Sequence, residues 1–118
     1  MTENRFSVEH RPAEHRYVIL DTAAEGGPAV AGEESYVDVT GADGRRDRVL
    51  FHTGVEDAYG GQGLAGQLVR FAVEDTIHAG LRVAPVCPYV VSWLEKHPGF
   101  AEHTVPAGPR HLRAVQRG

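Results

Sequence analysis

The stretch Gly60-Gly61-Gln62-Gly63-Leu64-Ala65 separates two different kinds of sequence. Before it, Arg48 to Thr53 contains a continuous apolar run, which is typical of a strand buried on both faces. After it, apolar residues recur at helical spacing and form one stripe: Leu64, Ala65, Leu68, Val69, Ala72, Val73, Thr76 and Ile77. The sequence therefore predicts a buried strand, a glycine turn and an amphipathic helix, in that order.

The segments on either side predict the rest of one α+β domain. Further strands are expected at Phe6 to Val8, Arg16 to Asp21, Ala29 to Val39 and Leu81 to Val86. Gly80 is a natural stop for the main helix, and Pro88 is a natural first residue for a second helix that runs to His97. Pro85 has no backbone N–H, so strand pairing should loosen there.

The order β-β-β-β-α-β-α predicts a single domain over residues 1–118, with its core at about 6–100. Both helices should pack on the sheet, the first starting near Gln62 and the second near Pro88. Residues 101–118 are a C-terminal tail, in which the segment from Arg110 to Arg117 forms either one helical turn or a frayed end.

Composition excludes several classes of protein. A net charge of -4 argues against a nucleic-acid partner, which usually selects a basic protein. No run of about 18 apolar residues occurs, so we expect no membrane association and a soluble, cytoplasmic protein. With Cys87 as the one cysteine, an internal disulfide and a cysteine-rich zinc site are impossible, and the scattered histidines lead us to predict no metal.

The glycine turn is a candidate anion site. It lies just before a helix, whose first backbone N–H groups are free and carry the positive end of the helix dipole. Glycines let a bulky anion such as a pyrophosphate approach the backbone closely. The turn could also be purely structural. A phosphate-binding loop is excluded because Leu64 and Ala65 stand where lysine and serine or threonine are required, and the dinucleotide fingerprint does not fit either.

The chain resembles the minimal GCN5-related N-acetyltransferases from about Phe6 to Phe100. The resemblance rests on His52-Thr53-Gly54-Val55, Ala58-Tyr59-Gly60-Gly61-Gln62-Gly63-Leu64-Ala65, Cys87-Pro88-Tyr89 and His97-Pro98. It implies a mixed, mostly antiparallel sheet with splayed central strands, and acetyl-CoA as the co-substrate. The residues implied to bind this cofactor are Thr53, Gly54, Val55, Gly60, Gly61, Gln62, Gly63, Leu64 and Ala65.

Two positions depart from the family pattern. Gly60 stands where the loop motif usually has arginine or glutamine, so a side-chain contact to the pyrophosphate is lost while backbone contacts remain. Gly54 stands where the minimal family typically has glutamate after His-Thr, so a carboxylate base at that position is excluded. The first departure predicts cofactor binding that is weaker but survives, and the second makes catalysis less secure than binding.

The candidate catalytic residues are Cys87 and His52. Cys87 directly precedes Pro88, and a helix N-terminus favours a thiolate that could act as a nucleophile. The alternative is a small buried hydrophobic residue and direct attack by the amine. The proton acceptor could be His52, or else His97, Glu56 or a chain of water molecules. His52 could equally be a hydrogen-bonded core residue.

Two functions remain open at this point. The first is an enzyme that transfers an acetyl or other short acyl group from coenzyme A to a small-molecule or peptide amine. The second is a non-catalytic acyl-CoA binding module that has lost its base. Tyr89 and Trp93, four residues apart, could line the acceptor pocket or simply pack on the sheet.

Overall fold

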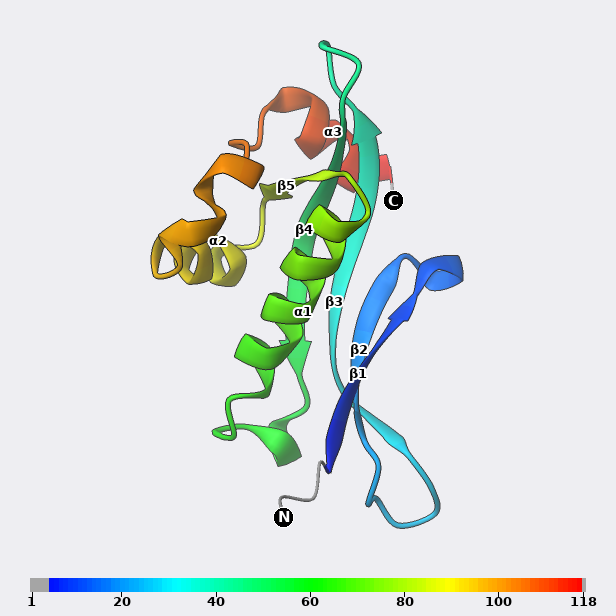
Figure 1. Ribbon diagram of the computed structural model, residues 1–118. Helices are drawn as coiled ribbons and strands as arrows, with labels where there is room; N and C mark the ends of the chain where they lie inside the picture. Colours follow the sequence, from blue (N-terminus) through cyan, green and yellow to red (C-terminus); the bar gives the residue numbers. More distant parts are fainter. Residues whose placement is uncertain (1–4, 118) are drawn as a thin grey trace.

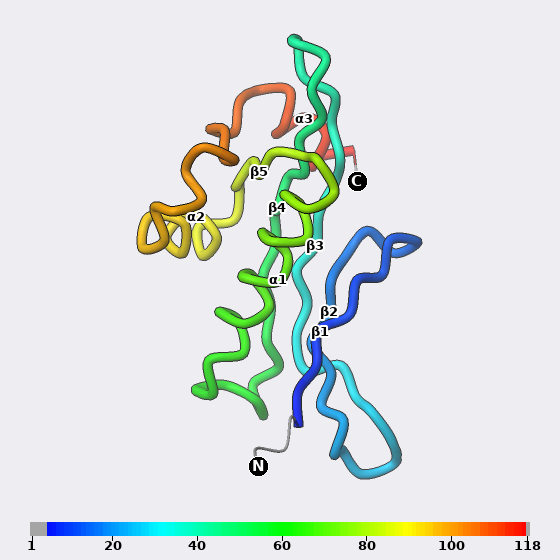
Figure 2. The backbone as a smooth tube through the Cα atoms, viewed as in Figure 1, coloured from blue at the N-terminus to red at the C-terminus, as the bar shows by residue number. Residues whose placement is uncertain are grey.

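Four strands follow one another in an antiparallel meander, because polar turns connect them directly. The computed structural model describes residues 5–117. The strands are β1 (Phe6–Arg11), β2 (Arg16–Asp21), β3 (Ala29–Thr40) and β4 (Arg46–Val55). The tube in Figure 2 shows that they cross the sheet in chain order, with β5 (Arg82–Pro85) added beside β4.

A helical crossover joins β4 to β5, which makes this pair parallel. The crossover is α1 (Leu64–His78), which lies across one face of the sheet (Figure 1). Its apolar stripe faces the strands, and Leu68, Val69, Ala72 and Val73 are completely buried. At about 1.5–3 kcal/mol for each large apolar side chain, this stripe is a major source of stability.

A β-bulge marks the place where β4 and β5 part. Tyr36 on β3 pairs with Leu50 and Ser35 pairs with His52, so Phe51 is an extra residue in β4. Bulges bend a strand and increase its twist. The pairing of β5 with β4 ends at the neighbouring pair, Leu50 and Pro85, while β4 continues to Val55. The splayed strands and the loosening at Pro85 therefore have a visible local cause.

Two more helices complete the layers. Helix α2 (Pro88–Glu95) packs beside α1 on the same face, whereas α3 (Pro109–Arg117) lies on the other face. Adjacent strand residues point to opposite faces. Arg48 reaches the Tyr17 hydroxyl on the α1 side, and Asp47 accepts a hydrogen bond of 2.9 Å from His111 Nε2 of α3. Three 3₁₀ turns (Pro12–Glu14, Asp57–Tyr59 and Pro98–His103) link these elements.

The predicted fold class is confirmed: a mixed, mostly antiparallel sheet carries the two main helices on it. Helix α1 begins at Leu64, two residues later than expected, because Gly63 adopts a left-handed conformation with φ of 74°. The end of the chain differs most from expectation. Residues 109–117 form more than one helical turn, and His111, only 8% exposed, anchors them to the sheet.

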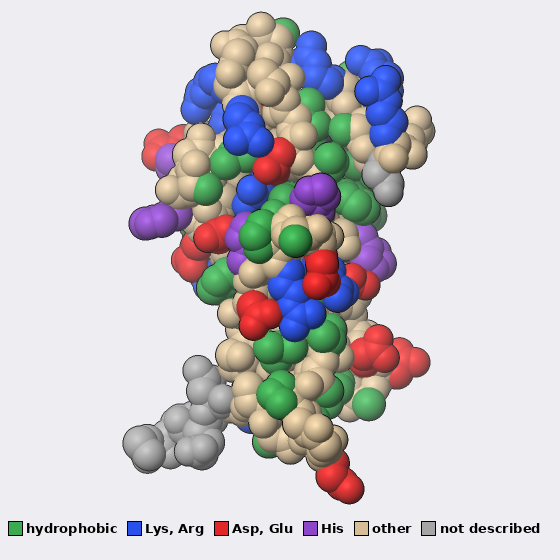
Figure 3. Space-filling view, turned by 90° about the vertical axis from the view of Figure 1, so that its right-hand side faces the viewer, with side chains coloured by type: hydrophobic (Ala, Val, Ile, Leu, Met, Phe, Trp, Pro, Cys, Tyr) green, Lys and Arg blue, Asp and Glu red, His purple; other side chains and the backbone are tan. Residues whose placement is uncertain are grey.

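Arginine side chains are concentrated at the end of the molecule formed by the β3–β4 hairpin and α3 (Figure 3). The exposed arginines of these two elements are Arg45, Arg46, Arg110, Arg113 and Arg117. The glycine turn lies at the other end of β4, after Val55. The basic end is thus distant from the candidate site.

Candidate active site

The glycine turn forms an open cradle at the N-terminus of α1. Gly61 and Gly63 have φ of 80° and 74°, conformations that other residues rarely adopt. A Cβ added to either glycine would meet no atom within 4 Å, so open space lies in front of the backbone. No side chain caps the helix and no acidic residue lies in its first turn. The free N–H groups of this turn therefore suit an anion.

Tyr59 fastens the start of this turn to the sheet. Its hydroxyl donates a hydrogen bond of 2.7 Å to Asp21 Oδ2, and its ring packs edge-on against Phe6. Arg5 binds the same carboxylate through two hydrogen bonds of 2.9 Å. These bonds, Arg5 first and Tyr59 next, hold the pKa of Asp21 far below its usual range. Tyr59 is therefore a support of the loop, a role that the sequence left undefined.

Beyond the bulge, β4 presents an edge without a neighbouring strand. Thr53, Gly54 and Val55 lie on this stretch, as the resemblance implied, directly before the segment that leads to the glycine turn. The edge faces the start of α2, because the backbone N–H of Cys87 still bonds to Leu50 O at 3.1 Å. The strand pairing of the sheet therefore has a gap between this edge and the N-terminus of α2, a few residues before the cradle along the chain.

Cys87 lies at the mouth of this gap as the N-cap of α2. It is 8% exposed, and its Sγ is 3.3 Å from Thr53 Oγ1. Burial alone would raise the pKa of the Cys87 thiol. Hydrogen bonding to the Thr53 side chain and to the backbone N–H groups of Val90 and Tyr89 outweighs burial and lowers that pKa below its ordinary value. Burial supports the interpretation of Cys87 as a small core residue, and the lowered pKa supports its interpretation as a nucleophile.

Glu34 is the residue that sequence reasoning missed. It pairs across the strands with Thr53, is completely buried, and accepts a short hydrogen bond from the Thr53 hydroxyl through Oε1. Its other oxygen, Oε2, has no partner within residues 5–117. Burial raises the pKa of Glu34 to about 9, against the opposing effect of the Thr53 hydrogen bond. Buried carboxyl groups with raised pKa values concentrate at functional sites.

His52 lies on the other face of the sheet from Cys87. Its neighbour Thr53 points towards Cys87, so strand alternation directs His52 away from it. The side chain is 55% exposed, and Nε2 lies 3.9 Å from Glu33 Oε2. His52 is thus not a core histidine. The structure does not bring the two candidate catalytic residues together on one face.

His52 borders a polar hollow of about 310 Å3. The hollow is open beside Gly54, where an added Cβ would lie 3.1 Å from His52 Nε2. The glutamate typical of the family at this position would therefore stand beside His52. Glu33 and Glu56 line the same hollow and supply carboxylates from other positions.

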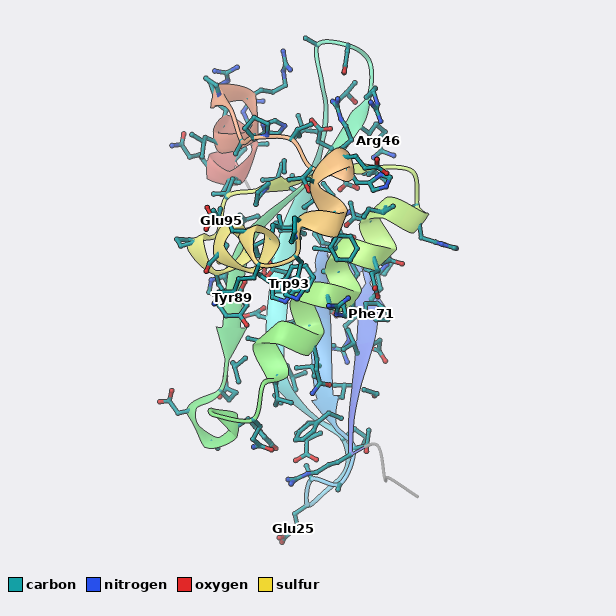
Figure 4. All side chains as sticks on the ribbon, turned by 60° about the vertical axis from the view of Figure 1, so that its left-hand side comes forward. Glu25, Arg46, Phe71, Tyr89, Trp93 and Glu95 are labelled. Atoms are coloured by element: carbon teal, nitrogen blue, oxygen red, sulfur yellow. The ribbon has the colours of Figure 1, made fainter. Side chains whose placement is uncertain are left out.

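The aromatic residues of α2 have separate roles. Trp93, labelled in Figure 4, is 8% exposed. It stacks on His97, whose Nδ1 lies 2.7 Å from the Trp93 carbonyl. Packing therefore accounts for both residues. Tyr89 is 42% exposed, and its hydroxyl lies beside Gly66 in the first turn of α1. It borders the entrance between the two helix N-termini.

A family model described as GCN5-related N-acetyl-transferase matches residues 16–103, which include every strand except β1 and all of α1 and α2. This chain belongs to the GCN5-related N-acetyltransferase family. The match covers the glycine turn, the open edge of β4 and Cys87. Among curated proteins, no sequence match was found.

Solved structures show the same fold. A GCN5-like protein from Staphylococcus aureus, determined by NMR, is 21% identical, with a TM-score of 0.60 over 92% of this chain and 97% of that one. A chain of the NatC complex bound to Gag peptide and CoA is 18% identical, with a TM-score of 0.57 over 73% of this chain and 55% of that one. A ribosomal-protein-alanine N-acetyltransferase from Brucella melitensis biovar Abortus 2308 is 15% identical, with a TM-score of 0.52 over 79% of this chain and 62% of that one.

Within residues 5–117, no helix combines the length and apolar character needed to cross a membrane. The same residues contain no group of three or more histidine, cysteine, aspartate or glutamate side chains placed to hold a metal ion.

Proposed function

We propose that this family member transfers a short acyl group, acetyl above all, from coenzyme A to an amine. One observation carries the proposal: the cradle of positive-φ glycines at the N-terminus of α1 adjoins the strand edge of β4 that the bulge at Phe51 leaves open. A pyrophosphate and a thioester arm are joined in coenzyme A, and these two neighbouring features suit the two parts.

The backbone of the cradle would hold the pyrophosphate. Gln62, Leu64 and Ala65 contribute N–H groups, while Gly61 and Gly63 leave the space for the phosphates. Gly60 contributes no side chain, and its N–H bonds instead to Asp57 O at 3.1 Å. The open edge at Thr53 to Val55 would pair with the amide groups of the pantetheine arm, since its peptide groups lack a partner strand there.

The amine can take the acyl group by either of two routes. In direct transfer, Cys87 only packs beside the thioester. In the covalent route, Cys87 Sγ attacks the thioester carbon, coenzyme A leaves, and the amine then displaces Cys87. The lowered pKa of the thiol and its position at the mouth of the gap favour the covalent route.

We infer that the acceptor carries a positive charge. The hollow on the outer face of β4 is lined by Glu33, Glu56 and Arg16, and Arg16 pairs with Glu33 at 3.0 Å, so Glu56 is the carboxylate left to attract an amine. His52 lines the same hollow and belongs to the same strand as Thr53. Because no strand covers the edge between these two faces, an acyl group held there is accessible from the hollow. A small-molecule or peptide amine would enter on this side, where the Glu56 carboxylate attracts it.

The test combines thiol release with intact mass spectrometry. With acetyl-CoA and a panel of cationic amines, we expect free coenzyme A in amounts that depend on the amine. With acetyl-CoA alone, we expect one added acetyl group, which Cys87→Ala abolishes together with turnover. Turnover that survives in Cys87→Ala would leave direct transfer as the route.

A non-catalytic acyl-CoA binding module is the second candidate. The glycines at positions 60 and 54 favour it, because each replaces a side chain that the family usually provides. Such a module would gain thermal stability from acetyl-CoA by mass action, yet release no thiol with any amine.

A further inference from the structure

Three side chains form a continuous hydrogen-bonded row from the sheet interior to the gap. The Glu34 carboxylate accepts from Thr53 Oγ1, and Thr53 Oγ1 lies 3.3 Å from Cys87 Sγ. Backbone pairing holds each of the three residues in place. Glu34 and Thr53 are cross-strand partners on β3 and β4, and Cys87 is held by the bond from its N–H to Leu50 O.

Packing does not explain a carboxyl group at this position. Glu34 is completely buried, and Oε2 has no partner within the described part of the chain. Burying an unpaired polar atom costs free energy that an apolar side chain would avoid. A leucine of similar size would fill the space. Because no group of the described chain donates to Oε2, the carboxyl group of Glu34 can bind a proton without losing a hydrogen bond.

We propose that Glu34 is the proton acceptor and donor for Cys87, acting through the hydroxyl of Thr53. The inference rests on the acyl transfer proposed above, in its covalent form. In molecules whose Glu34 is ionised, the thiol proton passes to Thr53 Oγ1 and the Thr53 proton passes to Glu34 as Cys87 Sγ bonds to the thioester carbon. The carbon–sulfur bond to coenzyme A breaks, and its thiolate takes a proton from water.

The second half of the reaction reverses this path. The amine nitrogen bonds to the acyl carbon and loses a proton to water. The bond from that carbon to Cys87 Sγ breaks, the sulfur receives the Thr53 proton, and Thr53 receives the proton stored on Glu34. Thr53 is unchanged overall. Glu34 touches no reacting atom, so it is a positioning and proton-holding residue, whereas Cys87 is the catalytic one.

The proton affinities of the two ends suit such an exchange. Burial raises the pKa of Glu34 to about 9, while hydrogen bonds lower the pKa of Cys87 below its ordinary value of 9.0. An ionised Glu34 therefore holds a proton more tightly than the Cys87 thiolate does, and transfer of the thiol proton to it costs little free energy. Glu33 is the other charged group that acts on Glu34. Tyr17, its partner on β2, directs its hydroxyl to Asp75, and the buried residues of the first α1 turns are Leu64 and Leu68.

Carbon NMR tests the coupling without any enzyme assay. Cys87 is the one cysteine, so 13Cβ-labelled cysteine gives a single signal, and comparison with Glu34→Gln assigns the Glu34 13Cδ signal. We expect both signals of the parent to titrate with two shared inflections. In Glu34→Gln, Cys87 should titrate with one. A Glu34 that titrates alone below pH 5, or a Cys87 curve unchanged in Glu34→Gln, would overturn the proposal.

Acylation kinetics test the use of the coupling. Glu34→Gln and Thr53→Val should each slow acetylation of Cys87 on the order of 100-fold near pH 9, where about half of the Glu34 side chains are ionised, with the KM for acetyl-CoA unchanged. Thr53→Ser keeps the hydroxyl and should restore most of the rate, which a purely structural role would not predict. Equal rates in Thr53→Val and Thr53→Ser would overturn the relay, and Thr53→Val also serves if Glu34→Gln does not fold.

The two levels of failure are distinguishable. If the parent releases coenzyme A only with an amine present and never carries an acetyl group, direct transfer holds and the proton exchange at Cys87 is wrong. If no thiol is released at all, the proposed transferase activity itself fails.

Discussion

The Tyr59 hydroxyl donates a hydrogen bond of 2.7 Å to Asp21 Oδ2, which ties the residue before the glycine turn to the last residue of β2. Asp21 is almost fully buried, and Arg5 holds it from the other side. The cradle is therefore shaped in advance by a strand that contributes nothing else to it.

Removing this hydroxyl should weaken cofactor binding. In Tyr59→Phe the ring still packs against Phe6, but the turn loses its link to Asp21 and must be ordered by the ligand. We expect the Kd for coenzyme A, measured by calorimetry, to rise severalfold. Tyr36→Phe removes a hydroxyl that contacts His10 instead and is the control, with Kd unchanged. Equal effects of both variants would mean that Tyr59 does not support the cradle.

Gly63→Val should abolish coenzyme A binding. The new side chain would occupy the open space before the helix N-terminus and strain a backbone with φ of 74°, at about 1–3 kcal/mol. Gly80→Val is the matched control, because Gly80 follows the same helix with φ of 85° and open space around it. That variant should show similar strain in thermal melts and bind normally. Full affinity in a folded Gly63→Val would remove the pyrophosphate site from this turn.

Leu68→Asp should destabilise the protein by about 3 kcal/mol or more. Leu68 is completely buried between α1 and the sheet, so the substitution would bury an unpaired charge. Gln67→Asp, one position away on the exposed side of α1, should change stability by about 0.5 kcal/mol or less. Urea denaturation of both variants measures the difference. Similar midpoints would contradict the orientation of α1.

Glu34 should make the protein less stable as pH rises. Its folded pKa of about 9 exceeds its ordinary value of 4.5, so between these values the native state holds a proton that the unfolded chain has lost. Stability then falls with pH by up to about 1.4 kcal/mol per unit, since fewer protons are bound in the unfolded state. Glu34→Gln does not titrate. It should gain stability relative to the parent from pH 5 to 7.5 in urea denaturation, and parallel curves would contradict this.

His52→Gln should affect only the amine half of the reaction. The side chain is 55% exposed and lies on the opposite face from Cys87, so we expect unchanged stability and unchanged acetylation of Cys87. Turnover with a cationic amine should fall on the order of 100-fold, the usual contribution of a general base. His103→Gln, with an exposed side chain outside the hollow, is the control. Slower acetylation of Cys87 in His52→Gln would contradict the division of roles.

The central unit of the fold was predictable because its signals are local. The apolar stripe of α1, the glycine turn and Pro88 at the first position of α2 each follow from spacing over a few residues. Loosening at Pro85 was predictable for the same reason, since a missing N–H is a property of one residue. The bulge at Phe51 was not, because it depends on how β3 and β4 pair across the sheet.

Glu34 shows most clearly what local patterns omit. It is followed in β3 by Ser35, and nothing in Glu33-Glu34-Ser35 distinguishes the completely buried glutamate from its neighbour in the outer hollow. Alternation along the strand gave two possible faces, and the register with Thr53 selected one. The exposure of His52 was missed for a related reason. The apolar run before it suggested burial, but the bulge at Phe51 intervenes and His52 points outward.

The order in which the sheet is assembled follows from its connectivity. Strands β1 to β4 are sequence neighbours joined by short turns, whereas β5 can pair with β4 only after α1 closes the crossover. Closing long loops costs more entropy and slows folding, so we expect the meander to form first and β5 to dock last. The gap beside Cys87 is created by that final docking. Coenzyme A therefore cannot serve as a template for early folding, and it should slow unfolding without accelerating refolding.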